Sequence, residues 1–271
     1  MPTLSPPSQV PDQFANVYGL GNLQTIYPVG VSNRWVSAIF GVLLIVAAGL
    51  VTIYGLYITS VQVTRYGPVM LWKSIITPLI IAAALFGIGV LAAINAYRNW
   101  NTSAAVYENG LAYCDNGGLQ TWPWHEIEWF TSAITKHYRN GIYTGTTYLY
   151  TLQKADGSKL LLNNRFKKIE ELGRFINQKV APLQYEKLRQ QLRSGQSVRL
   201  GQVSIDQQSL TINKKSYAWN EIDSVGIRNG YINIKKKDGG WFSGASAAVA
   251  SIPNIDPLLT TIDQIVKVKA G

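Results

Sequence analysis

Cysteine and histidine are scarce in this chain, and their scarcity excludes several kinds of site. Cys114 is the only cysteine, so no intramolecular disulfide can form, and a lone thiol suits a reducing compartment. His125 and His137 are the only histidines, and neither lies near a Cys-x-x-Cys, His-x-x-x-His or carboxylate cluster. We therefore expect no metal site.

Catalytic signatures are missing as well. The sequence holds no nucleophile elbow and no phosphate-binding Gly-x-x-x-x-Gly-Lys-Ser/Thr loop. Glu126 and Glu221 are the best candidates for a catalytic acid, but each lacks a second convergent carboxylate. The sequence predicts a protein that is not an enzyme and has no cofactor.

Charged residues are absent from two long stretches, residues 35–59 and 74–97, which are rich in Leu, Ile, Val and Ala. About 20 helical residues at 1.5 Å each cross a hydrocarbon core of ~30 Å, so each stretch predicts a transmembrane helix. A buried helical hairpin of a soluble protein is the alternative. The short connection makes the second helix return antiparallel, giving a hairpin over about residues 35–98. Small residues recur in both stretches, so the helices should pack on each other or on helices of another protein.

We expect no signal peptide, because the first 30 residues have no basic region. Pro-rich residues 1–18 suggest a tail, and residues 19–34 an interfacial segment with Tyr27 and Trp35 at headgroup level. Basic residues flank the spans evenly, so they do not decide the orientation. A large domain with a free thiol and no signal peptide favours both termini and the C-terminal domain in the cytoplasm.

After Trp100 the pattern changes to strands and turns, with an Asn-Gly turn at 109–110 and an Asp-Gly turn at 156–157. Helical spacing of apolar residues follows at Ile169, Leu172, Phe175 and Ile176. A second helix is predicted over about residues 182–193, because it starts with a proline and ends before Ser-Gly.

The same order then repeats. The motif Trp-x-Glu-Ile occurs at 124–127 and again at 219–222, an offset of 95, and the Asp-Gly turn at 156–157 recurs at 238–239, an offset of 82. An apolar helical face near the C-terminus closes the second copy. We predict two strand-rich units, residues 104–180 and 196–268, joined by a helix at 181–195 that is either a linker or part of the core.

A Trp-x-Glu-Ile strand, an Asp-Gly hairpin and a C-terminal helix together resemble the bacterial pleckstrin-homology-like (PH-like) domain. With the preceding hairpin, the chain is similar to uncharacterised bacterial membrane proteins that carry such domains. The Gly-Gln-Val strand start at 201–203 and the stretch at 239–256 are part of the likeness, which covers about residues 104–268. The resemblance implies an α+β membrane protein of the bacterial inner membrane. Each PH-like unit would be a bent antiparallel sheet closed by a helix, with no established activity.

Clustered basic residues are the main candidates for a binding site. A formal net charge of +10 accompanies them, and each Lys or Arg near an anionic bilayer is worth about 1 kcal/mol. The alternative is that these are solvated hairpin tips. Trp241 could insert into the interface or fill the sheet core. The candidate lipid- or partner-binding residues are Arg165, Lys167, Lys168, Lys214, Lys215, Lys235, Lys236, Lys237 and Trp241.

These features predict a non-enzymatic, membrane-anchored scaffold, lipid-surface sensor or accessory subunit of a larger membrane complex. Its expected partners are membrane lipids and a membrane protein or a second copy met through the small-residue helix faces. Nucleic acid is not expected, since no recognition helix accompanies the charge. An oligomeric transport or channel component is the alternative, although the spans lack ionisable groups. A lipid-headgroup enzyme is a third possibility.

Overall fold

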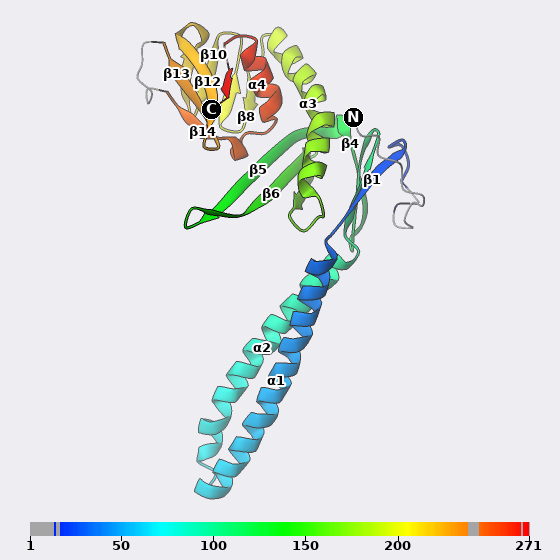
Figure 1. The fold of residues 1–271 in the computed structure, drawn as a ribbon, viewed down its shortest axis with the longest axis vertical. Coiled ribbons are helices and arrows are strands. Elements are labelled where there is room, and N and C mark those ends of the chain that lie inside the picture. Colours follow the sequence, from blue (N-terminus) through cyan, green and yellow to red (C-terminus); the bar gives the residue numbers. More distant parts are fainter. Residues whose placement is uncertain (1–13, 15–16, 238–243, 267, 271) are drawn as a thin grey trace.

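The computed structural model describes residues 14, 17–237, 244–266 and 268–270. It consists of two long apolar helices and a sheet-rich part, which confirms the α+β class (Figure 1). The Asp-Gly turn expected at 238–239, and Trp241 beside it, lie outside the described residues.

The two helices, α1 (Val31–Tyr66) and α2 (Met70–Trp100), form an antiparallel hairpin (Figure 1). They are longer than predicted, so the connection shrinks from residues 61–73 to 67–69, where Gly67 has a φ of +84°. Both are long and apolar enough to cross a membrane, and only 11% of the most apolar window of each is buried. Their apolar surface is thus largely uncovered by the described chain.

Glycines let the two helices approach closely. A Cβ added at Gly41 would lie 3.0 Å from the carbonyl oxygen of Gly89, and one added at Gly55 would lie 2.5 Å from Pro78. Gly49 and Gly87 differ, because an added Cβ there would meet nothing within 4 Å. Some small residues therefore pack the hairpin, and others face outward.

The helical hairpin is inserted into a sheet. Strand β1 (Leu23–Pro28) precedes α1, strand β2 (Ser103–Tyr107) follows α2, and the two pair antiparallel with Pro28 opposite Ser103. Residues 23–28 of the segment expected at the membrane interface thus form a strand of this sheet. The backbone N–H and C=O groups of this stretch find partners in β2 rather than at a lipid surface.

The first unit contains a four-stranded sheet in the order β1-β2-β3-β4 and a three-stranded sheet in the order β5-β6-β7, followed by helix α3. The further elements are β3 (Gly110–Asp115), β4 (Gly118–Pro123), the 3₁₀ turn η2 (Trp124–Glu126), β5 (Ile127–Arg139), β6 (Ile142–Lys154), β7 (Lys159–Asn163) and α3 (Ile169–Arg193). The hairpin turns predicted in this region fall between these strands.

The second unit repeats the plan with a sheet in the order β11-β10-β9-β8 and another in the order β14-β13-β12-β15. Asp206 turns the chain between two short strands in residues 203–212, because its carboxylate accepts hydrogen bonds from the N–H groups of Gln208 and Ser209. The elements are β8 (Val198–Leu200), β9 (Val203–Ile205), β10 (Ser209–Ile212), β11 (Lys215–Ala218), η3 (Trp219–Glu221), β12 (Ile222–Arg228), β13 (Tyr231–Lys236), β14 (Ser246–Ala248), η4 (Val249–Ser251), α4 (Ile255–Asp263) and β15 (Val268–Ala270).

One helix, α3, replaces the two that the sequence predicted and runs through Pro182. Its buried residues recur every four positions across the proline, so a single stripe faces inward along its whole length. The N-terminal part of this stripe, with Leu172 and Ile176, packs in the core of the first unit, whereas Leu188 and Leu192 pack in that of the second. Burial of side chains before and after Pro182 therefore outweighs the tendency of a proline to interrupt a helix.

The sequence repeat is also a repeat of contacts. The Trp124 indole donates to the carbonyl oxygen of Glu108 at 3.0 Å, and the Trp219 indole donates to that of Asp206 at 3.1 Å. Trp124 belongs to the first core and Trp219 packs against the second.

The glutamates of the two motifs form equivalent ion pairs. The Glu126 carboxylate lies 2.7 Å from Nζ of Lys154, and that of Glu221 lies 3.5 Å from Nζ of Lys236. Each lysine also lies over an aromatic ring of the strand before the motif, Lys154 over Trp122 and Lys236 over Tyr217. Both glutamates therefore have a structural partner.

Asn254, just before α4, joins the two units. Its Oδ1 accepts a hydrogen bond from the Phe130 N–H at 2.9 Å, and its own N–H donates to the Phe130 carbonyl at 2.7 Å. Its Nδ2 donates to the carbonyl of Glu128 at 2.8 Å, and Gln184 of α3 donates to that of Ile127. The backbone and side chain of Asn254 therefore bond to backbone groups of β5, as a neighbouring strand would.

The glycine contacts lead to a test of the hairpin. Gly41→Leu and Gly55→Leu should each destabilise it by about 1–3 kcal/mol, because the new side chain overpacks a close helix contact. Gly49→Leu is the matched control, since its side chain would point into open space. Thermal loss of helical circular dichroism in detergent would measure the effect. Equal melting of all three variants would show that the helices do not pack on this face.

The Asn254 contacts lead to a second test. Asn254→Ala should cost about 1–3 kcal/mol for each buried backbone group of β5 that it leaves unpaired. Asn213→Ala controls for backbone strain, because Asn213 and Asn254 have left-handed φ values of 50° and 52°, whereas the side chain of Asn213 donates to the exposed carbonyl of Ser246. Denaturant unfolding of the full chain would compare them. A loss no larger than that of Asn213→Ala would contradict the proposed joint.

Candidate functional site

The first predicted basic cluster lies where the helical hairpin leaves the sheet-rich part. Its loop, residues 164–168, connects β7 to α3 and is bonded to the backbone just before α1. The Gly30 N–H donates to the Arg165 carbonyl at 2.8 Å, and the Lys167 N–H donates to the Pro28 carbonyl at 3.0 Å. The fold therefore holds Arg165, Lys167 and Lys168 at the foot of the hairpin.

Arg165 also contacts the second helix. Its Nη1 donates to Oδ1 of Asn99 at 3.2 Å, and Nδ2 of Asn99 donates to Oδ1 of Asn95, one turn earlier, at 3.2 Å. Asn99 is buried, and Nε of Arg165 is buried without a hydrogen-bond partner among the described residues. Arg165 thus ties the loop to the end of α2.

Aromatic and basic side chains surround this foot. Trp35 of α1 and Trp100 of α2 meet edge to face with ring centroids 5.4 Å apart, and both remain exposed. Arg98, in the last turn of α2, is exposed as well. We call Arg98, Arg165, Lys167 and Lys168 the basic collar.

Acidic groups near the collar are already engaged. Nζ of Lys168 lies 3.3 Å from the Glu171 carboxylate, which also accepts a hydrogen bond from the Tyr27 hydroxyl at 3.3 Å. Burial, and then the negative charge of Glu171, raise the pKa of Tyr27 to about 12. Tyr27 therefore stays a neutral donor, and the collar keeps an excess of positive charge.

The other predicted clusters lie in the second unit, away from the foot of the hairpin (Figure 1). Lys214 lies in the turn between β10 and β11, and Lys215 is the first residue of β11. Lys235 lies 3.1 Å from Asp223, and Lys236 is the partner of Glu221. Lys237 follows β13, with its N–H bonded to the Glu221 carbonyl. The structure therefore does not bring the three clusters together.

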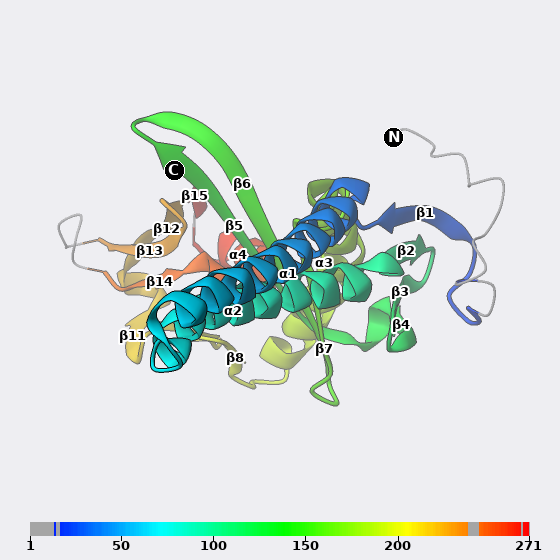
Figure 2. The same cartoon turned by 90° about the horizontal axis from the view of Figure 1, so that it is seen from below.

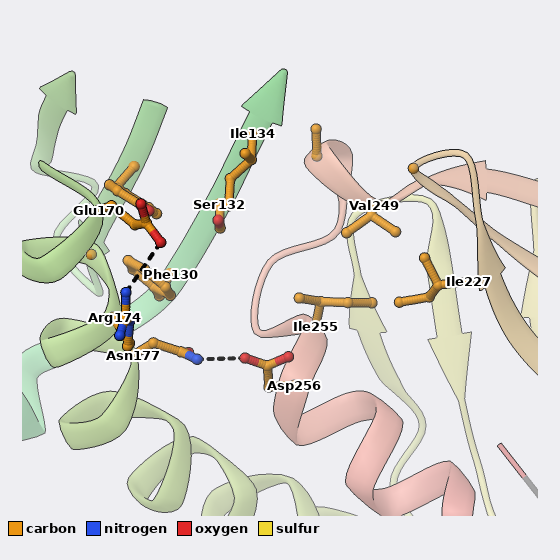
Figure 3. Close-up of a pocket in the computed structure, with 14 residues that line it drawn as sticks. Phe130, Ser132, Ile134, Glu170, Arg174, Asn177, Ile227, Val249, Ile255 and Asp256 are labelled. Atoms are coloured by element: carbon orange, nitrogen blue, oxygen red, sulfur yellow. Dashed lines mark hydrogen bonds and ion pairs between the residues drawn. The ribbon is translucent and has the colours of Figure 1, made fainter. Parts of the chain in front are cut away.

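A cleft of about 370 Å³ lies between the units, lined by β5, α3, the β12–β13 turn, η4 and the start of α4 (Figure 3). Apolar side chains such as Phe130, Ile134 and Ile255 form much of its wall. Its carboxylates are occupied, because Glu170 pairs with Arg174 at 3.1 Å and Asp256 accepts a hydrogen bond from Asn177. The cleft can hold an apolar group but presents no free acid and base pair.

Within residues 14, 17–237, 244–266 and 268–270, no three His, Cys, Asp or Glu side chains gather as metal ligands would. Cys114 is buried, and burial raises the pKa of its thiol, which disfavours a reactive thiolate. The basic collar is therefore the best candidate site in this part of the chain.

Sequence reasoning missed several residues that shape the site. Asn95 and Asn99 stand four positions apart at the end of an apolar stretch, which is a signal for a polar pair on one helix face. The approach of Arg165 to Asn99 had no local signal, because 66 positions separate them.

The fold and the collar define a class of protein: an apolar helical hairpin inserted into the first of two sheet-rich units, with basic residues at its foot. The chain belongs to a family of unknown function, DUF6585, whose model matches residues 5–270. No curated protein matches the chain.

Proposed function

We propose that this protein is a non-enzymatic membrane anchor and scaffold whose collar binds the anionic headgroups of the bilayer that its helices span. The proposal rests on the hydrogen bonds that attach the basic loop to both helices at the foot of the hairpin. The loop is bonded to Pro28 and Gly30, just before α1, and to Asn99, near the end of α2. Charge is thereby held where a bilayer surface would meet the protein.

Helix length and aromatic placement support a spanning hairpin. The two candidate spans are 32 and 31 residues long, which at 1.5 Å per residue exceeds a ~30 Å hydrocarbon core by several turns. Exposed Trp35 and Trp100 mark one end and Tyr66 and Trp72 the other, as expected for aromatic belts. A free thiol and the size of the sheet-rich part favour the cytoplasmic face of a bacterial inner membrane.

The sheet arrangement supports the PH-like assignment. In the first unit a four-stranded sheet is followed by a three-stranded sheet and a helix. In the second unit the same order recurs, with β15 added beside β12. The equivalent Trp and Glu contacts in both copies are consistent with two related units.

The outward glycines support a partner in the membrane. Gly49 and Gly87 leave room on the outer surface of the hairpin, and small residues of this kind let a further helix approach closely. We propose that this face binds a membrane protein or a second copy, which would make the chain an accessory subunit of a larger assembly.

Removing charge from the collar tests lipid binding. The triple variant Arg98→Gln, Lys167→Gln, Lys168→Gln should retain fewer phosphatidylglycerol molecules in native mass spectrometry after mild detergent extraction, since each charge contributes about 1 kcal/mol. Arg165 is left unchanged in this variant, because its hydrogen bond to Asn99 attaches the loop to α2.

The matched control removes three charges from the second unit: Lys214→Gln, Lys215→Gln, Lys237→Gln. It should retain as much anionic lipid as the parent chain. An equal loss in both variants would mean that overall charge, rather than the collar, attracts the lipid.

Gentle extraction and affinity capture test the partner. We expect a membrane protein or a second copy to co-purify in fixed stoichiometry with the parent chain and to be lost with Gly49→Leu, which should not weaken the hairpin itself. Recovery of the chain alone, with both parent and variant, would remove the accessory-subunit proposal and leave the lipid contact.

A further inference from the structure

The β5–β6 ribbon projects far beyond the sheet that it belongs to (Figures 1 and 2). Both strands are 13 residues long, but β7 pairs with β6 only from Leu149 inward. From there to the turn at Asn140–Gly141 the ribbon has two strands, with Ala133 opposite Leu149 and Tyr138 opposite Tyr143. A ribbon of two strands is marginal in water, so its outer part calls for a partner surface.

The outer ribbon exposes apolar and aromatic side chains. Ile134, Tyr138, Ile142 and Tyr143 are between 53% and 70% exposed. Scattered apolar residues on a surface are ordinary, but these four are gathered on one narrow projection.

The end of the ribbon is ordered by its own contacts. The rings of Tyr138 and Tyr143 meet edge to face with centroids 5.9 Å apart, and the Tyr143 hydroxyl lies 2.7 Å from Oγ1 of Thr146. Nε2 of His137 lies 2.7 Å from Oγ1 of Thr147. The turn uses the left-handed φ values of Asn140 and Gly141, 51° and 79°, which suit a tight hairpin. These contacts shape the end of the ribbon, but they leave its apolar side chains exposed.

The outer ribbon carries charge of one sign. No Asp or Glu occurs between Glu128 and Asp156, whereas Lys136 and Arg139 lie close to the turn. An aromatic end flanked only by basic residues matches the polar and anionic boundary of a bilayer, where tyrosine rings lie at headgroup level.

The position of the ribbon agrees with this chemistry. Figure 1 shows its free end at the lower edge of the sheet-rich part, the edge from which α1 and α2 extend. Seen from below, the ribbon reaches outward beside the helices rather than along them (Figure 2). Its end and the foot of the hairpin therefore stand on the same side of the molecule.

We propose that the end of the β5–β6 ribbon is a second membrane contact: Tyr138, Ile142 and Tyr143 enter the bilayer interface, and Lys136 and Arg139 meet anionic headgroups. The occupant of this surface is the lipid bilayer itself. The inference rests on the proposed insertion of α1 and α2, but it is independent of the collar. With two separated contacts, the sheet-rich part would be held at a fixed tilt to the membrane.

Depth-dependent fluorescence quenching tests this contact in the full chain. On a Cys114→Ser background, Ile142→Cys is labelled with an environment-sensitive fluorophore in phosphatidylcholine vesicles containing phosphatidylglycerol. Quenchers attached near the headgroup of the lipid should strongly reduce its fluorescence. The reduction should become smaller when phosphatidylglycerol is omitted or when Lys136→Gln and Arg139→Gln are added.

Two further labels make the outcome unambiguous. Ser197→Cys follows the far end of α3, which Figure 1 places opposite the foot of the hairpin, and should show no quenching. Gly49→Cys, in the middle of α1, should be quenched only by groups deep in the bilayer.

Each pattern of quenching has a distinct meaning. An unquenched Gly49 label would overturn membrane insertion itself. A quenched Gly49 label with an unquenched Ile142 label would overturn only the ribbon contact. If the Ile142 fluorophore reported an apolar environment but resisted lipid quenchers, the ribbon would be covered by protein, such as a second copy, and the proposal would be rejected.

Discussion

The stripe of buried side chains along α3 is the constraint on which the sheet-rich part depends. A helix that buried only its first half would end near Pro182 and leave two independent units. Instead the stripe continues through Gln184 to Leu188 and Leu192, so side chains of the same helix, α3, pack in the cores of both units. Gln184 and Asn254 then satisfy the β5 backbone groups between the two cores, where an apolar contact would leave them unpaired.

The two copies of the repeat differ in structure. The first copy accepts the helical hairpin between its first two strands, carries the collar and extends the long ribbon. The second copy lies against the first through α3, α4 and Asn254, and its basic residues Lys235 and Lys236 are used in ion pairs. Sequence positions that correspond in the repeat therefore carry different structural features in the two copies.

Local patterns were predictable from the sequence, and non-local ones were not. The apolar spans, the turns around β3 and β7 and the repeated Trp-x-Glu-Ile motif depend on neighbouring residues, so they could be predicted. The pairing of β1 with β2 could not, because the whole hairpin lies between them. Pro182 and Ser194-Gly195 are local signals for helix termini. The helix does end at Arg193, just before Ser194, but the start predicted at Pro182 is wrong because burial in two cores continues α3 through the proline.

For the candidate site the same division holds. The sequence identified Arg165, Lys167 and Lys168 as a basic cluster, because they are neighbours in the chain. It could not place them beside Asn99, nor show that Lys235 and Lys236 would be paired. The exposed ribbon could not be recognised, because apolar and aromatic residues in a strand are equally typical of the face that packs on a core.

The insertion of the hairpin between β1 and β2 has a consequence for the order of events during synthesis. A ribosome makes β1 first, then both helices, and only then the strand that pairs with β1. The first sheet can close only after the helices have been made and have returned to their starting side, since Pro28 and Ser103 must meet. This sheet can therefore be completed only in a chain whose hairpin has the correct topology. In a chain with misplaced helices, β1 would remain unpaired.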